Sequence, residues 1–378
     1  MPKRRSFERV RDSSAINLAI GQPSDDLMPR DLLGAGAKRF FESQQSGTLN
    51  YGAPSGELEF RTALADFLST EDGHEVNPDT LFLTGGSSQG LDLICAQFTQ
   101  PGDTVLVESA SYFLAFQIFQ DHGLKIVGVS TDHEGLCIDE LEQAIVQHQA
   151  KLIYTIPSYG NPTGMTLSAN RRDAIVALSK RHQIIVAADE AYQQLHFAAA
   201  PPPSFGSRAD LGQVIVLGTF SKILAPGLRV GWLQLGQTLR EQLLDTGWIN
   251  SGGAINHFGA MITREVLVSG AMVQHLGQLR EALNRRAESM DAALHDCLGP
   301  QAQWHRPAGG YFFWVGLAHS ANTQDTLPSA VRAGTGYLPG NICAASGGFD
   351  HYLRLSFAAY DCQQITEGIK RLGRVLAS

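Results

Sequence analysis

Short apolar runs alternate with amphipathic stretches between Leu81 and Leu235, and this alternation constrains the fold more than any other feature of the chain. The runs consist mostly of Val, Ile and Leu, which is typical of strands that are buried on both faces of a parallel sheet. Strands that alternate with helices imply right-handed crossovers and an open α/β sheet. We expect strands at Leu81–Thr84, Thr104–Val107, Lys125–Val129, Lys151–Ile156, Ile184–Ala188, Val214–Gly218 and Arg229–Leu235.

The pattern changes after Leu239 to long helical stretches and becomes mixed from Trp304 onward. Two strands, Tyr311–Val315 and Tyr352–Phe357, precede a closing helix that begins with the capping-box pair Asp361 and Gln364. This mixture predicts a second, smaller α+β domain. We expect an N-terminal arm that joins the small domain (residues 1–45), a large domain (46–275) and a small C-terminal domain (276–378).

Two local signals mark boundaries within the large domain. Ser168 is expected to cap the helix that follows it, and that helix ends in the basic residues Lys180, Arg181 and His182. The stretch Ala198–Pro203 runs from alanines into three prolines, which cannot continue a helix, so we expect a loop.

The composition excludes several classes of protein. The 378 residues carry 37 acidic and 29 basic side chains, a net charge of −8, which argues against a general nucleic-acid binder. Five cysteines without a C-x-x-C pair fit reduced thiols in the cytoplasm. The histidines form no H-E-x-x-H motif, and we expect no metal site. No apolar run approaches the roughly 20 residues of a membrane span, and no targeting segment is evident, so we expect a cytoplasmic protein.

The segment from Thr84 to Gly90 reads TGGSSQG and follows a predicted strand. A glycine-rich turn that opens a helix directs free backbone N–H groups and the positive end of the helix dipole toward an anion such as phosphate. The same residues match G-x-S-x-G, the nucleophile elbow of α/β-hydrolases, with Ser88 as the nucleophile. A plain tight turn is a third interpretation, and these residues alone leave all three open.

Two further motifs follow predicted strands. Asn161 begins the turn Asn-Pro-Thr-Gly, and Asp189 directly follows a buried run. In open α/β sheets, ligands bind at the carboxyl ends of the strands, so both side chains are candidates for a binding site. Each also has a structural interpretation: Asn161 as part of a simple turn and Asp189 as the cap of the next helix.

Lys222 and Arg354 each have two interpretations. Lys222 follows an apolar strand, where desolvation would favour the neutral amine that a Schiff base needs, although a lysine at a strand end can also extend to solvent. Arg354 alternates with Leu353 and Leu355, so it faces away from them, either into solvent or into a site where it could bind a carboxylate through two hydrogen bonds.

Taken together and in this order, these motifs resemble the class I/II aminotransferases, which are pyridoxal-phosphate enzymes of fold type I. The resemblance runs from about Ile16 to Phe357 and is nearest to the branch with 2-aminoadipate and kynurenine aminotransferases. It implies a mainly parallel central sheet with helices on both faces plus a smaller α+β domain. It also implies a homodimer with composite active sites, pyridoxal 5′-phosphate as cofactor, and amino acid and 2-oxo acid substrates.

The resemblance also implies the role of each site residue. Lys222 would form a Schiff base with the cofactor, Asp189 would keep the pyridine nitrogen protonated, and Tyr192 would hydrogen-bond the ring hydroxyl. Arg354 would bind the substrate carboxylate, and Tyr51 would reach the phosphate of the neighbouring subunit. Other cofactor contacts would come from Gly86, Ser87, Ser88, Tyr112, Asn161, Thr219, Ser221 and Arg229, and other substrate contacts from Gly21 and Asn161.

The implied reaction is transamination by a ping-pong mechanism, with Lys222 as the group that moves the Cα proton. Another pyridoxal-phosphate reaction on the same fold, such as β-elimination, racemisation or decarboxylation, is the alternative. A serine hydrolase at Ser88 and a DNA-binding regulator are two more distant alternatives. A regulator would need a winged-helix domain, and about 15 residues precede Ile16, so we do not expect one.

Overall fold

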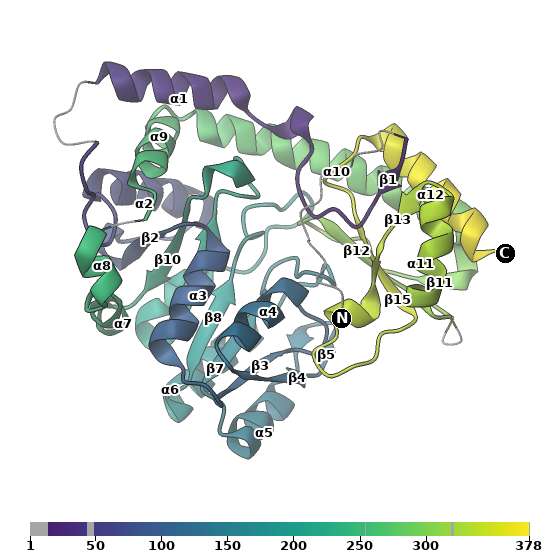
Figure 1. Cartoon of the computed structure of the whole chain (residues 1–378), viewed down its shortest axis with the longest axis horizontal. Helices are drawn as coiled ribbons and strands as arrows, with labels where there is room; N and C mark the ends of the chain where they lie inside the picture. Colours follow the sequence, from purple (N-terminus) through teal and green to yellow (C-terminus); the bar gives the residue numbers. More distant parts are fainter. Residues whose placement is uncertain (1–13, 44–48, 254, 319–320, 378) are drawn as a thin grey trace.

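A seven-stranded sheet lies at the centre of the larger part of the molecule in the computed structural model, which describes residues 14–43, 49–253, 255–318 and 321–377 (Figure 1). The strand order is β2-β10-β9-β8-β7-β3-β4. The strands are β2 (Leu81–Thr84), β3 (Thr104–Glu108), β4 (Lys125–Val129), β7 (Leu152–Thr155), β8 (Ile185–Asp189), β9 (Val214–Thr219) and β10 (Gly231–Leu235). All seven predicted strands are confirmed, with ends that shift by no more than two residues.

Strand β10 departs from the parallel arrangement, because it runs antiparallel to both β2 and β9 while the other neighbours are parallel. Only residues 220–230 connect β9 to β10. A parallel crossover needs about a dozen or more residues, usually with a helix, whereas an antiparallel return can be short. The apolar sequence of β10 does not reveal its direction, because a strand buried on both faces has the same pattern whether it runs parallel or antiparallel to its neighbours.

A second sheet of four antiparallel strands, in the order β11-β12-β15-β14, forms the smaller part at the right of Figure 1. A parallel pair links the N-terminal segment, through β1, to β13 of this part. The remaining strands are β1 (Ile16–Asn17), β5 (Thr131–Asp132), β6 (Gly135–Leu136), β11 (Ala302–Gln303), β12 (Phe312–Leu317), β13 (Thr335–Gly336), β14 (Leu338–Pro339) and β15 (Tyr352–Ser356).

Helices cover both faces of the central sheet, and alternate residues of each strand point to opposite sides. On one side, Leu106 and Val186 pack with Ile175 in one core, while on the other Val105 and Ala187 belong to a larger core. The helices are α1 (Arg30–Glu42), α2 (Leu58–Asp72), α3 (Ser87–Phe98), α4 (Phe113–Asp121), α5 (Ile138–His148), α6 (Ala169–His182), α7 (Gln237–Leu244), α8 (Gly247–Gly252), α9 (His257–Val268), α10 (Ala271–Cys297), α11 (Thr323–Arg332) and α12 (Cys362–Leu376).

The long helix α10 extends from the region of α9 toward the smaller sheet (Figure 1). The expected boundary between residues 275 and 276 falls inside this helix, and the domain limits stay predictions. Residues 1–13, on which the expectation of no targeting segment rests, lie outside the described residues.

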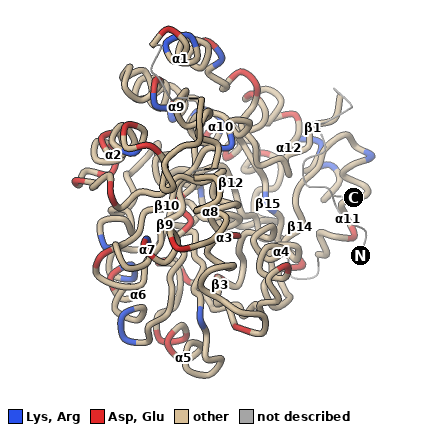
Figure 2. The backbone as a smooth tube through the Cα atoms, turned by 60° about the vertical axis from the view of Figure 1, so that its left-hand side comes forward, with Lys and Arg blue, Asp and Glu red and all other residues tan. Residues whose placement is uncertain are grey.

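The outer helix α1 carries both basic and acidic residues, which are blue and red in Figure 2. None of the described helices combines the length and the apolar character that crossing a membrane would require.

Three local predictions are confirmed. The Ser168 side chain caps α6 by accepting a hydrogen bond from the backbone N–H of Arg171, and the Ala198–Pro203 stretch is a loop. Asp361 and Gln364 form both hydrogen bonds of a capping box at the start of α12. This helix buries Ile365, Ile369 and Leu372 against the smaller part.

Replacing the cap in Asp361→Ala should lower the free energy of unfolding by about 1 kcal/mol, because the backbone N–H of Gln364 in the first turn of α12 loses the carboxylate that accepts its hydrogen bond. Urea denaturation followed by circular dichroism measures this change. Lys370→Ala, an exposed change within the same helix, is the matched control and should have little effect. Equal stability of Asp361→Ala and Lys370→Ala would contradict the stabilising role of the cap.

Candidate active site

Lys222 lies in the turn that follows β9, at the carboxyl end of a buried strand. Its Nζ donates a hydrogen bond of 3.0 Å to the carbonyl oxygen of Gly21 and lies 5.7 Å from the centre of the Tyr311 ring. The Tyr311 hydroxyl donates to the backbone carbonyl of Lys222 at 2.7 Å and thereby fixes the turn. Burial, and then the nearby charge of Arg354, lower the pKa of Lys222 to about 8. The amine therefore points inward and loses its proton more readily than an ordinary lysine.

Asp189 ends β8, the strand next to β9. Its Oδ2 accepts a hydrogen bond of 2.8 Å from the Tyr154 hydroxyl, and its Oδ1 accepts one of 3.3 Å from the backbone N–H of Ala191. Burial raises the pKa of Asp189 to about 6, against the opposing effect of these two donors and of the charge on Lys222. This carboxylate is buried at the edge of the sheet where ligands bind, instead of capping an exposed helix.

A cradle for an anion forms where α3, β9 and β10 meet. Gly86 is the N-cap of α3 with φ of +100°, a conformation that side chains rarely adopt, and a Cβ there would lie 2.7 Å from Arg229 Nη2. Arg229 Nη1 donates to Ser221 Oγ at 3.3 Å, and the Thr219 hydroxyl donates to the same Oγ at 2.9 Å. Backbone N–H groups, hydroxyls and a guanidinium thus converge, and this donor set suits a phosphate.

Helix α3 starts inside the TGGSSQG segment. The helix begins at Ser87, so Ser87 and Ser88 lie in its first turn and not in a loop before it. The first helical turn has unpaired backbone N–H groups, which favours the interpretation of TGGSSQG as a phosphate cradle.

Arg354 lies on β15 and is only 3% exposed, so the structure rejects the solvent-facing interpretation. Its Nη1 donates to Asn161 Oδ1 and its Nη2 to the carbonyl oxygen of Ala19, each at 2.7 Å. The guanidinium carbon lies 4.1 Å from the centre of the Phe312 ring. Its Nε is buried without a hydrogen-bond partner. A carboxylate that approaches the guanidinium from the side can accept hydrogen bonds from Nε and the adjacent Nη at once.

Aromatic side chains line the space between these charges. Tyr192 is buried, and its ring lies 5.5 Å from that of Tyr311 and 5.9 Å from that of Phe312. Tyr112 precedes α4; burial, and then the charge of Asp189, raise the pKa of its hydroxyl to about 12. Gly21 borders Phe312 so closely that a Cβ would lie 3.0 Å from its ring.

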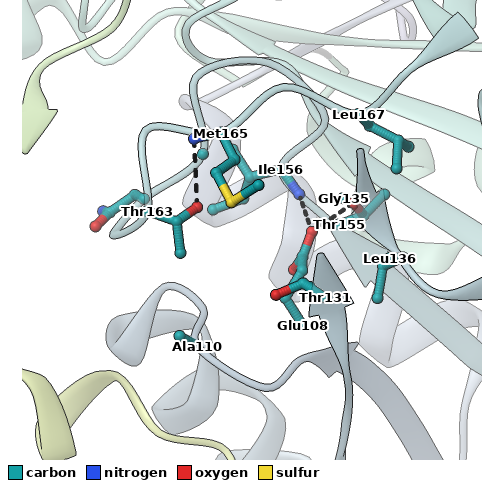
Figure 3. Close-up of a pocket in the computed structure, with 12 residues that line it drawn as sticks. Glu108, Ala110, Thr131, Gly135, Leu136, Thr155, Ile156, Thr163, Met165 and Leu167 are labelled. Atoms are coloured by element: carbon teal, nitrogen blue, oxygen red, sulfur yellow. Dashed lines mark hydrogen bonds between the residues drawn. The ribbon is translucent and has the colours of Figure 1, made fainter. Parts of the chain in front are cut away.

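Glu108 was not predicted as part of this region. Figure 3 shows its carboxylate against the end of β7, where it accepts hydrogen bonds from Thr155 Oγ1 at 2.5 Å and from the backbone N–H of Ile156 at 3.0 Å. The hydroxyl of Ser111 donates to the other carboxylate oxygen at 3.0 Å. Glu108 therefore joins the segment before Tyr112 to the strand that leads toward Asn161, and burial raises its pKa.

Sequence reasoning also missed the hydroxyl of Tyr154 and the rings of Tyr311 and Phe312. Tyr154 lies in a run of apolar residues and Phe312 in another, so both have the signal of ordinary core positions. The predicted residues that the structure brings together around the buried space are Gly21, Gly86, Tyr112, Asn161, Asp189, Tyr192, Thr219, Ser221, Lys222, Arg229 and Arg354. Tyr51 is 87% exposed, and within one chain it is not brought to this group.

The residues fit pyridoxal phosphate. The Gly86 cradle suits its phosphate, the Asp189 carboxylate its ring nitrogen, and the Lys222 amine its aldehyde. The unpaired Nε of Arg354 and the Nη beside it suit a carboxylate.

Comparison with known proteins agrees with this chemistry. The family model for aminotransferase class I and II matches residues 13–372. An aromatic-amino-acid aminotransferase of Thermococcus litoralis is 31% identical over 378 residues, which cover 99% of this chain and 90% of the relative. An uncharacterised HTH-type transcriptional regulator of Bacillus subtilis, YisV, is 32% identical over 361 residues, which cover 94% of this chain and 72% of the regulator.

Among solved structures, the α-aminoadipate aminotransferase LysN of Thermus thermophilus, complexed with N-(5′-phosphopyridoxyl)-L-leucine, superposes with a TM-score of 0.87 and 29% identity. The match covers 97% of this chain and 92% of LysN. The expected fold, transferase activity and cofactor are thereby confirmed. With almost its whole length matched, the chain belongs to the aminotransferase class I and II family and is a pyridoxal-phosphate-dependent enzyme of fold type I.

Proposed function

We propose that this aminotransferase moves the amino group between an α-amino acid and a 2-oxo acid at the site formed by Lys222, Asp189 and Arg354. The observation that carries this assignment is the convergence on one space of two buried charged groups, Asp189 and Arg354, and the partly buried amine of Lys222. Asp189 ends β8, Lys222 follows the neighbouring strand β9, and Arg354 reaches the same space from the smaller sheet. Burial is the main cause of the shift in each pKa: it raises the pKa of Asp189 and lowers those of Lys222 and Arg354. The charge of at least one other site residue also contributes to each shift.

The mechanism assigns a separate task to each residue. When bound, pyridoxal phosphate supplies an aldehyde for Schiff-base formation and a ring that accepts the electrons released at the substrate Cα. Arg354 binds the substrate carboxylate and thereby orients the Cα–H bond. The neutral Nζ of Lys222 would remove the Cα proton and deliver it to the carbon that the cofactor's aldehyde supplies, and one flexible amine can reach both carbons.

The remaining residues hold the cofactor in the orientation that this proton transfer requires. Asp189 would keep the ring nitrogen protonated, which would stabilise the developing negative charge. Tyr192 and Asn161 would hydrogen-bond the ring hydroxyl, and Tyr112 would stack on the ring. Gly86, Ser87 and Ser88 at the start of α3 would hold the phosphate together with Thr219, Ser221 and Arg229.

We also propose that the active unit is a homodimer in which Tyr51 binds the partner's cofactor phosphate. Exposed apolar side chains support this proposal: Phe41 is 60% exposed, Leu58 54% and Phe258 45%. Phe41 and Phe258 contact each other, with ring centres 6.0 Å apart, on the adjacent helices α1 and α9 (Figure 1). The segment of the exposed Tyr51 lies beside α9, since a Cβ at Gly52 would lie 2.7 Å from the His257 ring. An apolar patch of this kind is typical of a surface that a partner covers.

A cytoplasmic location and the three domain ranges are part of the same proposal. The five cysteines are free thiols, which supports a reducing compartment. The pairing of β1 with β13 supports an N-terminal arm that joins the small domain.

Borohydride reduction of the protein with pyridoxal phosphate should attach a phosphopyridoxyl group to Lys222. The labelling rate should rise with pH and reach half of its maximum near pH 8, because the neutral amine reacts and the pKa of Lys222 is about 8. Peptide mapping by mass spectrometry locates the adduct. Lys222→Ala should give no specific adduct and no turnover. An adduct on another lysine, or a rate that keeps rising to the ordinary lysine value of 10.5, would contradict the assignment.

Arg354→Lys should lower kcat/KM for α-amino acids about a hundredfold, since an ammonium cannot make the side-on pair of hydrogen bonds that a guanidinium makes. The loss should appear mainly in KM, measured by steady-state kinetics on protein whose cofactor content has been matched. Arg306→Lys, on the surface, is the control. If Arg354→Lys changed kcat/KM no more than the control, Arg354 would not be the carboxylate-binding residue.

Mixing inactive Tyr51→Phe and Lys222→Ala homodimers should restore activity, because a mixed dimer contains one site with both residues intact. The restored fraction of the wild-type activity should approach the value expected if the subunits exchange at random. Exchange is verified by native mass spectrometry, and the Tyr51 variant alone must be impaired. A fully active monomer, or verified exchange without restored activity, would refute the role of Tyr51 in the partner's site.

A further inference from the structure

We propose that Tyr154 is a positioning residue that donates a hydrogen bond to Asp189. This bond keeps the proton that Asp189 shares with the cofactor's ring nitrogen on the nitrogen. The proposal rests on the proposed role of Asp189. The Tyr154 hydroxyl lies 2.8 Å from Asp189 Oδ2, on the neighbouring strand of the central sheet.

The position of Tyr154 explains why its hydroxyl is fixed. The side chain has no exposed surface and stands in β7, where it pairs in register with Val107 of β3 and Ala187 of β8. The Phe119 ring packs edge-to-face against it, with the ring centres 5.5 Å apart. A phenylalanine would fill this apolar environment equally well. A buried hydroxyl is unfavourable unless it is hydrogen-bonded, and the carboxylate of Asp189 provides the partner.

The hydrogen bond from Tyr154 stabilises the ionised form of Asp189. Each donor to a carboxylate stabilises its ionised form and makes it a weaker base. Burial favours the protonated form of Asp189, and the hydroxyl of Tyr154 is the largest opposing influence, ahead of the Ala191 N–H and the charge of Lys222. Other ionisable groups facing this pair are Glu108, at the end of β3, and Tyr112, before α4.

A shared proton lies on the more basic of its two partners. Without the donor from Tyr154, Asp189 becomes a stronger base and draws the proton away from the ring nitrogen. The ring then withdraws electrons less strongly, so the Schiff-base nitrogen on Lys222 becomes more basic. The pH midpoint of the cofactor's visible absorption change reports this basicity and is independent of turnover.

The test compares Tyr154→Phe with Tyr337→Phe in the cofactor-loaded protein. Tyr337 is the matched control, because its buried hydroxyl donates to the backbone carbonyl of Thr323 at 2.7 Å, within the smaller part and away from Asp189. Tyr154→Phe should raise the spectral midpoint by about half a pH unit and lower kcat about tenfold, with KM little changed. Tyr337→Phe should leave both at the wild-type values. A midpoint for Tyr154→Phe within about 0.1 unit of wild type would overturn the proposal, since a hydrogen bond to a charged group shifts a pKa by more than this.

Asp189→Asn separates this proposal from the proposed function. If Asp189 acts on the ring nitrogen, Asp189→Asn shifts the midpoint, and adding Tyr154→Phe to it causes no further shift. If Asp189→Asn itself leaves the midpoint and kcat unchanged, the proposed role of Asp189 fails. If Asp189→Asn has its effect and Tyr154→Phe has none, only the role of Tyr154 fails.

A second variant keeps the test decisive if Tyr154→Phe does not fold. Site-specific replacement of Tyr154 by 3,5-difluorotyrosine retains the hydroxyl and makes it a stronger donor. The midpoint should then move downward, opposite to the shift in Tyr154→Phe. An upward shift, or none, would contradict the proposal.

Discussion

The hydrogen bonds of Arg354 join three distant parts of the chain into one site. This guanidinium extends from the smaller sheet and donates to Asn161, in the loop after β7, and to Ala19, in the N-terminal segment. Leaving any of its donors buried and unpaired is unfavourable, so the three segments are held together by the need to satisfy one charge. The unpaired Nε is the exception, and a substrate carboxylate would satisfy it. In the proposed function, substrate binding and the assembly of the site thus depend on the same side chain.

The central sheet arranges the remaining charges so that burial alters their chemistry. Asp189 ends one strand and Lys222 follows the adjacent one, and desolvation there raises the pKa of the acid and lowers that of the amine. Both shifts bring the groups nearer to neutral pH, which suits a proton-transfer site. The phosphate cradle needs no such shift, since Gly86 and the first turn of α3 present backbone N–H groups whatever the pH.

The parts that could be predicted from the sequence follow from strong local patterns. The strands appear as apolar runs, and Asp189 and Lys222 were candidates because each follows such a run. Their chemical roles came from the resemblance to a family and not from the runs. The antiparallel direction of β10 could not be predicted, because a strand buried on both faces has no directional pattern. Tyr154 was missed because a tyrosine in an apolar strand resembles any core residue until its neighbour across the sheet is known.

The half-reaction with a single amino acid tests the central claim most directly. Cofactor-loaded protein is mixed with one L-amino acid and no 2-oxo acid, and the absorption spectrum and the products are recorded together. We expect the visible band to disappear as one equivalent of 2-oxo acid forms per site, and to return when a 2-oxo acid is added. Formation of a racemised, decarboxylated or eliminated product, with the visible band retained and no 2-oxo acid matching the amino donor, would contradict transamination at this site.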